Sequence, residues 1–100
     1  MIAKNTYKIK AKVWLYQSET AAWHFVSLDK KLSTEIKEAH AVKKKGFGSV
    51  PVEITLGKTV WETSIFPSKD GPYVLPLKAQ VRRKEDIRVE DEISFILKIR

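Results

Sequence analysis

Cysteine is absent from this chain of 100 residues, so neither a disulfide bond nor a cysteine-ligated zinc ion can hold the fold together. Its stability must therefore come from packing. Because proteins of the reducing cytoplasm rarely rely on disulfides, the missing cysteine is consistent with a cytoplasmic location.

Long apolar runs are also absent. The N-terminus reads Met-Ile-Ala-Lys-Asn-Thr and lacks the apolar stretch of a signal peptide, and no segment approaches the roughly 20 apolar residues that cross a bilayer. We therefore expect a soluble, cytoplasmic protein without a membrane partner. With 43% apolar residues the chain can bury one core, so residues 1–100 are expected to form a single domain.

Few residues support catalysis. The two histidines, His24 and His40, do not stand at a metal-binding spacing, and Ser64 and Ser68 have no base in their sequence context. The glycines of residues 46–49 follow a predicted helix instead of opening one, unlike those of a phosphate-binding loop. We expect no catalytic residues, no metal and no cofactor, and hence a non-enzymatic protein.

Acidic residues are in the minority, because 12 stand against 19 lysines and arginines and the formal net charge is +7. A basic chain attracts anionic partners such as nucleic acid. A net charge of about 2 to 8 is nevertheless ordinary for a small soluble domain. Only Arg82, Arg83, Arg88 and Arg100 carry the guanidinium group that reads bases best. Charge alone therefore favours solubility over nucleic-acid binding.

What the chain does contain is alternation of apolar and polar residues. Between Tyr7 and Tyr16 every second residue is suited to a core, which is typical of a half-buried strand. Gly57-Lys58 separates two further alternating segments and predicts a two-residue hairpin turn. Strands are expected over residues 7–16, 22–28, 50–56, 59–65, 73–81 and 93–99.

One segment between these strands has helical spacing. Leu32 and Ile36 fall on one face, Asp29 is suited to the N-cap, and residues 43–46 would form a basic last turn closed by glycine. A short helical turn fits at residues 82–86. Each half of the chain thus contains strand, strand, helix or helical turn, strand. The expected fold is mainly β, a small closed six-stranded barrel with the amphipathic helix and the short turn as caps.

An ordered set of motifs spans nearly the whole chain: Trp23-His24-Phe25-Val26, KKKGFGSVPVEITLG, residues 61–67, Asp70-Gly71, residues 73–76 and residues 81–93. Together they resemble a family of bacteria and archaea known only as a domain of unknown function. Its members are sometimes fused to a YdeI/OmpD-associated (bacteriocin-protection) domain. The resemblance implies a double-split β-barrel capped by helical segments, and it implies no established activity.

The segment from Val74 to Arg82, with Ile87 to Ile93 after it, is also similar to the swapped-hairpin motif of the AbrB, MazE and MraZ group. Many proteins of that group bind DNA as dimers. Here one chain contains both halves, so a monomer is competent to form the barrel, and a dimer is not excluded. Glu90 departs from the motif, because a glycine commonly precedes the aspartate there. If this turn requires a positive φ, Glu90 carries backbone strain.

Two groups of basic residues are suited to nucleic acid. On the outer face of the first strand three lysines lie in line with two aromatic residues, which combines phosphate contact with base stacking. A basic turn before the last strand matches the basic region of the DNA-binding group. Structural roles compete, because lysines protect exposed strands from pairing and an outward tryptophan can lie under a loop or helix. The candidate contacts are Lys8, Lys10, Lys12, Trp14, Tyr16, Arg82, Arg83 and Lys84.

A two-residue turn at Gly57-Lys58 places Ile54 opposite Trp61 inside the barrel and Glu53 opposite Glu62 outside. Opposed carboxylates repel, so either a lysine from the neighbouring strand bridges them or the repulsion raises one pKa. The first alternative is a surface cluster and the second is an acid–base pair. An open sheet face lacks the concave setting of a catalytic pair and favours the cluster.

Four aromatic residues, Trp23, Trp61, Phe66 and Tyr73, could line a ligand pocket in the barrel mouth, although aromatics at strand spacing are more often core. The sequence thus favours an uncharacterised, non-enzymatic binding module with an unknown macromolecular partner. Nucleic acid, DNA in particular, is the alternative partner. An enzyme that uses the paired glutamates is a distant third hypothesis.

Overall fold

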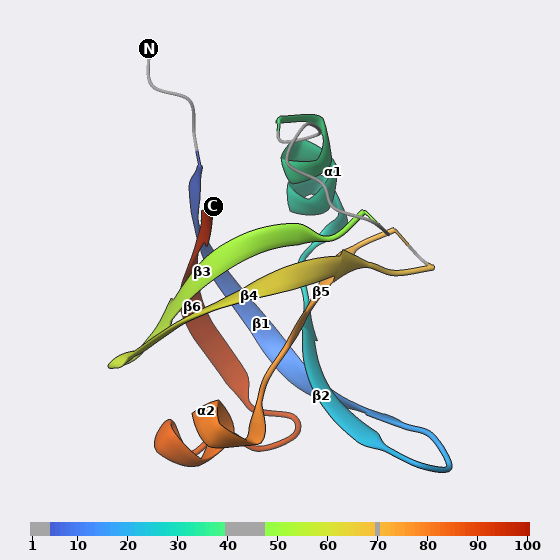
Figure 1. The fold of residues 1–100 in the computed structure, drawn as a ribbon, viewed down its shortest axis with the longest axis vertical. Helices are drawn as coiled ribbons and strands as arrows, with labels where there is room; N and C mark the ends of the chain where they lie inside the picture. Colours follow the sequence, from blue (N-terminus) through green and yellow to red (C-terminus); the bar gives the residue numbers. More distant parts are fainter. Residues whose placement is uncertain (1–4, 40–47, 70) are drawn as a thin grey trace.

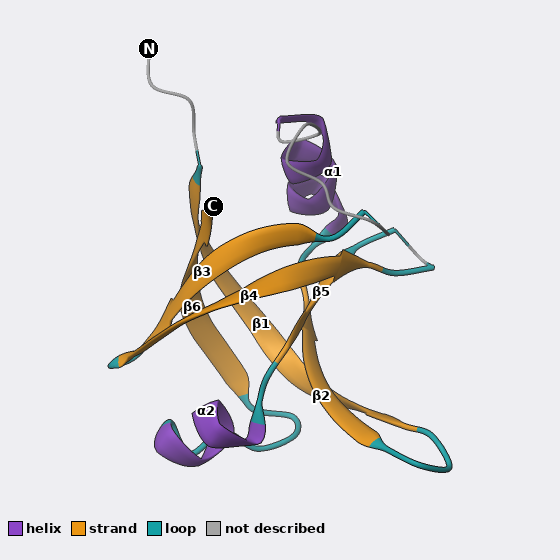
Figure 2. Ribbon diagram, viewed as in Figure 1, coloured by secondary structure: helices purple, strands orange, loops and turns teal. Residues whose placement is uncertain are grey.

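The computed structural model describes residues 5–39, 48–69 and 71–100. Its strands close into an antiparallel barrel in the order β1-β2-β5-β4-β3-β6 (Figures 1 and 2). The elements are β1 (Thr6–Gln17), β2 (Ala22–Ser27), α1 (Lys30–Ala39), β3 (Val50–Leu56), β4 (Thr59–Pro67), β5 (Tyr73–Pro76), α2 (Ala79–Lys84) and β6 (Glu92–Ile99). The predicted six-stranded closed barrel is confirmed, and one chain is sufficient to close it.

The two halves of the chain take equivalent places in this barrel. In order, β1, β2, α1 and β3 correspond to β4, β5, α2 and β6. Replacing each strand by its counterpart leaves the set of neighbours unchanged, since the β1–β2 pair becomes β4–β5 and the β1–β6 pair becomes β4–β3. The two helices accordingly lie at opposite ends of the barrel (Figure 1). The repeated order of elements in the sequence is therefore also a repeat of topology.

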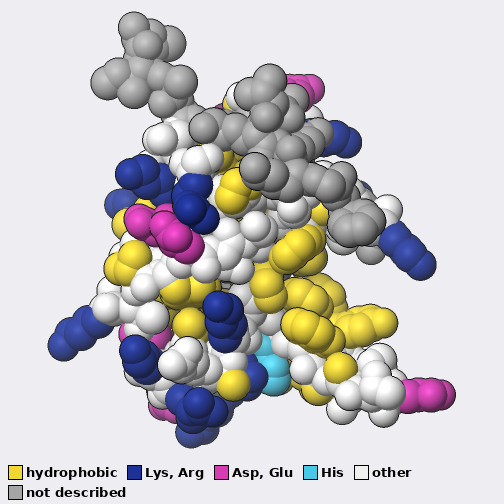
Figure 3. All heavy atoms as spheres, in the orientation of Figure 1, with side chains coloured by type: hydrophobic (Ala, Val, Ile, Leu, Met, Phe, Trp, Pro, Cys, Tyr) yellow, Lys and Arg dark blue, Asp and Glu magenta, His cyan; other side chains and the backbone are white. Residues whose placement is uncertain are grey.

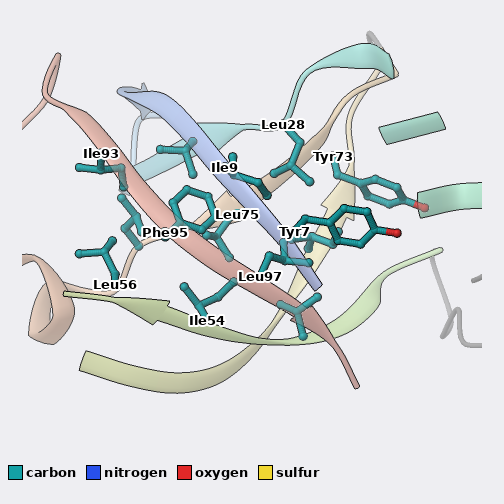
Figure 4. Packing of buried hydrophobic residues seen from close by; sticks show 14 of the residues in the cluster. Tyr7, Ile9, Leu28, Ile54, Leu56, Tyr73, Leu75, Ile93, Phe95 and Leu97 are labelled. Atoms are coloured by element: carbon teal, nitrogen blue, oxygen red, sulfur yellow. The ribbon is translucent and has the colours of Figure 1, made fainter. Parts of the chain in front are cut away.

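The inward residues of the six strands form one core, in which β3 shows an unbroken alternation of buried and half-buried positions (Figure 4). Full burial of an aliphatic side chain such as Ile54 contributes about 1.5–3 kcal/mol. Tyr7 and Tyr73 point toward the same end of the barrel (Figure 4). Burial raises the pKa of both hydroxyl groups, and the carboxylate of Glu35 raises the pKa of Tyr7 further.

Strand β1 changes its partner at Val13. Residues 6–12 pair with β6, and residues 13–17 pair with β2. The turn before β6 closes on this point, because the Val13 N–H donates to the Asp91 carbonyl and the Glu90 N–H donates to the Val13 carbonyl, both at 2.8 Å. Beyond Val13 the β1–β2 hairpin projects from the barrel (Figure 1). Leu15 alternates in phase with the inward residues, but it lies in this projecting part of the hairpin and is 36% exposed.

Positive φ angles occur at Gly57 and Glu90, among other turn residues. Gly57, in the predicted two-residue turn between β3 and β4, has φ +59°, and a Cβ atom there would collide with the carboxylate of Glu85. That carboxylate also accepts a 2.7 Å hydrogen bond from the Thr59 hydroxyl, which ties the end of α2 to the hairpin. Glu90 has φ +78°, so the turn before β6 does require the conformation that favours glycine.

Helix α1 begins as the sequence predicts. The Asp29 carboxylate accepts a 2.6 Å hydrogen bond from the Leu32 N–H and caps the first turn. The buried Ser33 hydroxyl accepts a 2.9 Å hydrogen bond from the Tyr73 N–H and joins the helix to β5. The basic last turn predicted at residues 43–46 lies outside the described residues. No helix in the described part of the chain is long and apolar enough to span a membrane.

The fifth strand is shorter than predicted. Strand β5 ends at Pro76 and α2 begins at Ala79, so the prediction of a strand to Val81 with a helical turn only at residues 82–86 was wrong. Pro76 has no N–H to donate to a continuing ladder. Leu77 and Val81 are buried, as they would also be in a strand, because a spacing of four residues fits both periods. Ala79 distinguishes the two, because a strand would turn it inward with Leu77 and Val81, whereas it is exposed.

Candidate interaction surfaces

The lysines predicted on the outer face of β1 do lie there, and all three are exposed. Lys10 Nζ lies 3.5 Å from the Glu92 carboxylate and Lys12 Nζ lies 3.8 Å from that of Glu90. Lys8 and Lys10 also line a hollow of about 440 Å³ over β1, β3 and β6. A phosphate group that contacts this row would have to compete with the two carboxylates.

Trp14 and Tyr16 continue the row on the same face of β1, but in different environments. Trp14 is half-buried, with its indole Nε1 donating to the Ser27 hydroxyl at 2.9 Å and its ring 5.2 Å from that of Phe25. Neither a helix nor a loop is needed to explain this burial, because the neighbouring strand supplies it. Tyr16 is 51% exposed and is available for a partner.

The basic turn predicted at residues 82–84 is part of α2. Arg82 is half-buried, and its Nε donates to the Leu77 carbonyl at 3.2 Å, so this side chain holds the helix against the end of β5. Arg83 and Lys84 are exposed. Only two of the three predicted basic contacts therefore present a free surface.

His24 is part of β2 and pairs with Leu15 in the β1–β2 hairpin, and its Nε2 is 3.5 Å from the Arg82 guanidinium. Burial lowers the pKa of His24, and the charge of Arg82 lowers it further. Its Nδ1 is buried without a hydrogen-bond partner among the described residues. The carbonyl of His24 accepts a 2.8 Å bond from the Leu77 N–H. The neutral imidazole thus occupies the junction between β2 and the segment leading into α2.

The opposed glutamates are confirmed, since Glu53 pairs with Glu62 and Ile54 pairs with Trp61 in the β3–β4 register. Arg100 lies 3.4 Å from Glu62, and the register of β3 with β6 places Lys98 beside Glu53. Cations thus flank both carboxylates, as expected of a surface cluster, although the ion pair to Glu62 is made by an arginine and not by the predicted lysine.

We call the outward surface of β6 and the adjoining parts of β1, β3 and β4 the charged face. Charged residues of both signs lie on it beside uncharged ones such as Ile96. The charged residues are Lys8, Lys10, Lys12, Glu53, Glu62, Glu92, Lys98 and Arg100.

The other half of the outer surface is apolar. Over β2, β4 and β5 hydrophobic side chains gather on one side of the molecule (Figure 3). They line a groove of about 420 Å³ that we call the aromatic groove. Its lining residues are Tyr16, Trp23, Phe25, Phe66, Val74 and Pro76. The rings of Trp23 and Phe25 stack at 6.3 Å with an angle of 9°.

The sequence interpretation that aromatics at strand spacing belong to the core was right for Tyr73, which is 3% exposed, and wrong for Trp23 and Phe66, which are 50% and 42% exposed. The alternation of inward and outward residues could have identified Trp23 and Phe66 as outward. Val26 is in the core, so Trp23 lies on the opposite face of β2, and Phe66 follows the buried Ile65.

Among the residues that the structure describes, no group of three or more histidine, cysteine, aspartate and glutamate side chains could hold a metal ion. Residues 10–97 match the domain of unknown function DUF1905. This match confirms the resemblance to a domain family of unknown function. No curated protein matches the chain. The likeness of one segment to the AbrB group stays a prediction.

Proposed function

This chain belongs to the DUF1905 family, and we propose that it is a non-enzymatic binding module that holds an apolar segment of a protein partner in the aromatic groove. The exposure of Tyr16, Trp23 and Phe66 side by side is the observation that carries the proposal. Contiguous apolar surface on a soluble protein commonly marks an interaction site, because its burial releases water.

The chemistry of the groove matches the centre of a protein interface. Its six lining residues include four aromatic side chains and no charged one. Interface cores are depleted in charge and enriched in tyrosine, tryptophan and phenylalanine, and tryptophan and tyrosine are frequent among the residues that dominate binding energy. The stacked rings of Trp23 and Phe25 form a wall that needs little ordering when a ligand binds. A volume of about 420 Å³ suits a few apolar side chains of an extended segment.

Peptide selection tests this function. Peptides selected from a random display library on the full chain should converge on apolar and aromatic residues. Trp23→Ser should weaken their binding about 30-fold, as expected for loss of a dominant interface residue. Ile96→Ser is the matched control, because Ile96 is an outward apolar residue, 38% exposed, on the charged face. It should leave binding unchanged.

Two outcomes contradict the proposal. One is a selection without convergence, or with peptides that bind Trp23→Ser as well as the unchanged protein. The other is concentration-dependent self-association, measured by sedimentation, that Trp23→Ser abolishes. In that case a second copy of the chain occupies the groove.

Nucleic-acid binding remains the alternative because the lysine row of β1 leads directly into Trp14 and Tyr16. Bases would stack on the aromatic rings while lysines contact phosphates. This function predicts affinity for labelled single-stranded DNA or RNA that falls steeply with salt and that drops in Lys8→Gln but not in Lys31→Gln, a change on α1. An absence of binding at low ionic strength would exclude it.

A further inference from the structure

The contact between β2 and α2 is made by three residues, one from each element and one from the segment between β5 and α2. The His24 carbonyl accepts a 2.8 Å hydrogen bond from the Leu77 N–H, and the Leu77 carbonyl accepts a 3.2 Å bond from Arg82 Nε. The Arg82 guanidinium also meets the imidazole, with Nη1 3.5 Å from His24 Nε2. We call these three residues the junction cluster.

The junction cluster fixes the protonation of the imidazole. A guanidinium can only donate hydrogen bonds, so the Nε2 that it approaches is the unprotonated nitrogen of a neutral ring. The ring proton is then on Nδ1, which is buried and has no hydrogen-bond partner among the described residues. A second proton, on Nε2, would set an N–H of the imidazolium against an N–H of Arg82 with no acceptor between them. The geometry therefore accommodates the neutral imidazole and disfavours the imidazolium.

The charges around His24 act in the same direction. Its partner in β1 is Leu15, and the segment before α2 contributes Leu77, so neither of these neighbours is charged. The charge that acts on the imidazole is that of Arg82, which adds to the effect of burial and lowers the pKa of His24. Among the described residues Arg82 forms no ion pair with a carboxylate. The other charged residues at the start and end of α2 are all basic and exposed: Lys78, Arg83 and Lys84.

The junction cluster adjoins the aromatic groove. Trp23 and Phe25 flank His24 in β2, and Pro76 directly precedes Leu77, so three of the six lining residues of the groove are sequence neighbours of the cluster. Phe25 and Pro76 also pair with each other in the β2–β5 register. A movement of Leu77 away from β2 would therefore displace the wall of the groove at Pro76.

We propose that His24 and Arg82 form a pH switch, in which protonation of His24 separates α2 from β2 and loosens the Pro76 wall of the aromatic groove. The imidazolium and the guanidinium repel each other, and each regains water as a hydrogen-bond partner when they separate. The junction is closed above the ordinary histidine pKa of about 6.5 and opens as the pH falls below it, because the closed state binds the proton less readily. The effect on ligand binding, unlike the opening itself, rests on the proposed function.

Amide hydrogen exchange of the full chain tests the opening without a ligand. Protection of the Leu77 N–H, corrected for the intrinsic pH dependence of exchange, should fall about tenfold between about pH 7 and 5, as a pKa difference of about one unit between closed and open states would produce. The Leu28 N–H, which donates to the Tyr73 carbonyl at 2.9 Å, is the internal reference and should keep its protection. Constant protection of Leu77, or an equal loss at both amides, would overturn the switch.

Variants of the junction cluster identify the cause of the opening. His24→Gln has no titrating ring and should make the protection of Leu77 independent of pH. Arg82→Gln should lower this protection at every pH through the lost bond, reduce its pH dependence and raise the pKa of His24 measured by nuclear magnetic resonance, because the repelling charge is gone. Arg83→Gln removes an exposed charge from the same helix and should preserve the pH dependence.

Two results with these variants contradict the switch. One is a pH dependence of Leu77 protection that persists in His24→Gln, and the other is an unaltered pKa of His24 in Arg82→Gln. If Arg82→Gln does not fold, the unchanged protein and His24→Gln still decide.

Binding of the selected apolar peptides measures the effect on the aromatic groove. Their affinity should be about fivefold weaker at pH 5 than at pH 7 for the unchanged protein, which is at the lower end of coupling between sites, and equal at the two pH values for His24→Gln. A loss of the same size in both proteins would overturn the coupling to the groove. Failure to select any peptide contradicts the proposed function alone, because the exchange measurements require no ligand.

Discussion

The outer surface of the barrel has two contrasting halves. On the charged face, carboxylates and cationic side chains lie side by side and neutralise one another, as Lys10 does with Glu92 and Arg100 with Glu62. In the aromatic groove no charged side chain is present. The inner faces of both halves belong to the same core. The two halves therefore differ in their outward side chains and not in the core that their inward side chains share.

Strand β1 contains the boundary between the two halves. Its outward residues are lysines at residues 8, 10 and 12 and aromatics at residues 14 and 16, and the change coincides with the exchange of β6 for β2 as its neighbour. Two hydrogen bonds from the Glu90–Asp91 turn mark the same point. A single strand thus contributes to both surfaces, because the outward residues of its two parts meet different neighbouring strands.

The largest expected effect comes from placing a charge in the aromatic groove. Phe66→Lys places an ammonium group in the groove and should weaken binding of the selected apolar peptides at least 30-fold, since the charge must be desolvated. Ile96→Lys adds the same charge on the opposite half and should leave affinity unchanged. Titration calorimetry measures both. Equal effects of the two changes would remove the functional distinction between the halves.

A second prediction concerns the turn at the boundary. Glu90→Gly should raise the free energy of unfolding by about 1 kcal/mol, because relief of strain at φ +78° exceeds the entropy cost of glycine and the loss of an exposed pair with Lys12. Glu90→Val should lower it, since a β-branched residue tolerates positive φ poorly. Urea unfolding provides the measurement. A glycine variant less stable than the unchanged protein would show that the turn is not strained.

A smaller effect is expected at the opposed glutamates. Arg100→Ala leaves Glu62 without its cation and should reduce stability by about 0.5 kcal/mol at low salt, the discounted value for an exposed pair. About 1 M salt should remove most of this loss through screening. Adding Glu53→Gln should restore stability, because the repulsion is then gone. A loss that neither salt nor the second change reduces would point to packing instead of charge.

The smallest prediction concerns pH and the aromatic half. The pKa of His24 is lowered in the folded protein. The folded protein therefore binds a proton at this imidazole less readily than the unfolded chain, in which the pKa is about 6.5. Stability should therefore be highest above that pH and fall as pH decreases toward the lower, folded pKa. His24→Gln should flatten the pH dependence below about pH 6.5. An unchanged slope in urea unfolding would exclude His24 as its source.

Much of the fold could be predicted because alternation and turn chemistry act locally. The Gly57-Lys58 turn specified the β3–β4 register, including the opposed glutamates, and Asp29 specified the start of α1. The error at β5 arose where the local signal was ambiguous. Leu77 and Val81 satisfy both a strand and a helix, and only the exposure of Ala79 in the folded chain distinguishes them.

The candidate sites were less predictable. The outward position of the three β1 lysines was predicted correctly, but their carboxylate partners on β6 and in the preceding turn come from the other end of the chain. Ser33 carried no signal for its bond to the Tyr73 N–H, because the two residues are 40 positions apart. The contact of Arg82 with His24 likewise joins residues that are 58 positions apart.

The sequence by itself determined most of the residues that face inward, where the main turns lie and that the chain repeats its order of elements, because the two-residue period of a strand and the backbone demands of a turn are local properties. Only the tertiary structure decided which outward residues become neighbours. The aromatic groove exists because β5 lies between β2 and β4, which brings Trp23, Phe66 and Pro76 together from distant parts of the chain. Such neighbours depend on the closure of the whole barrel, which no local pattern encodes.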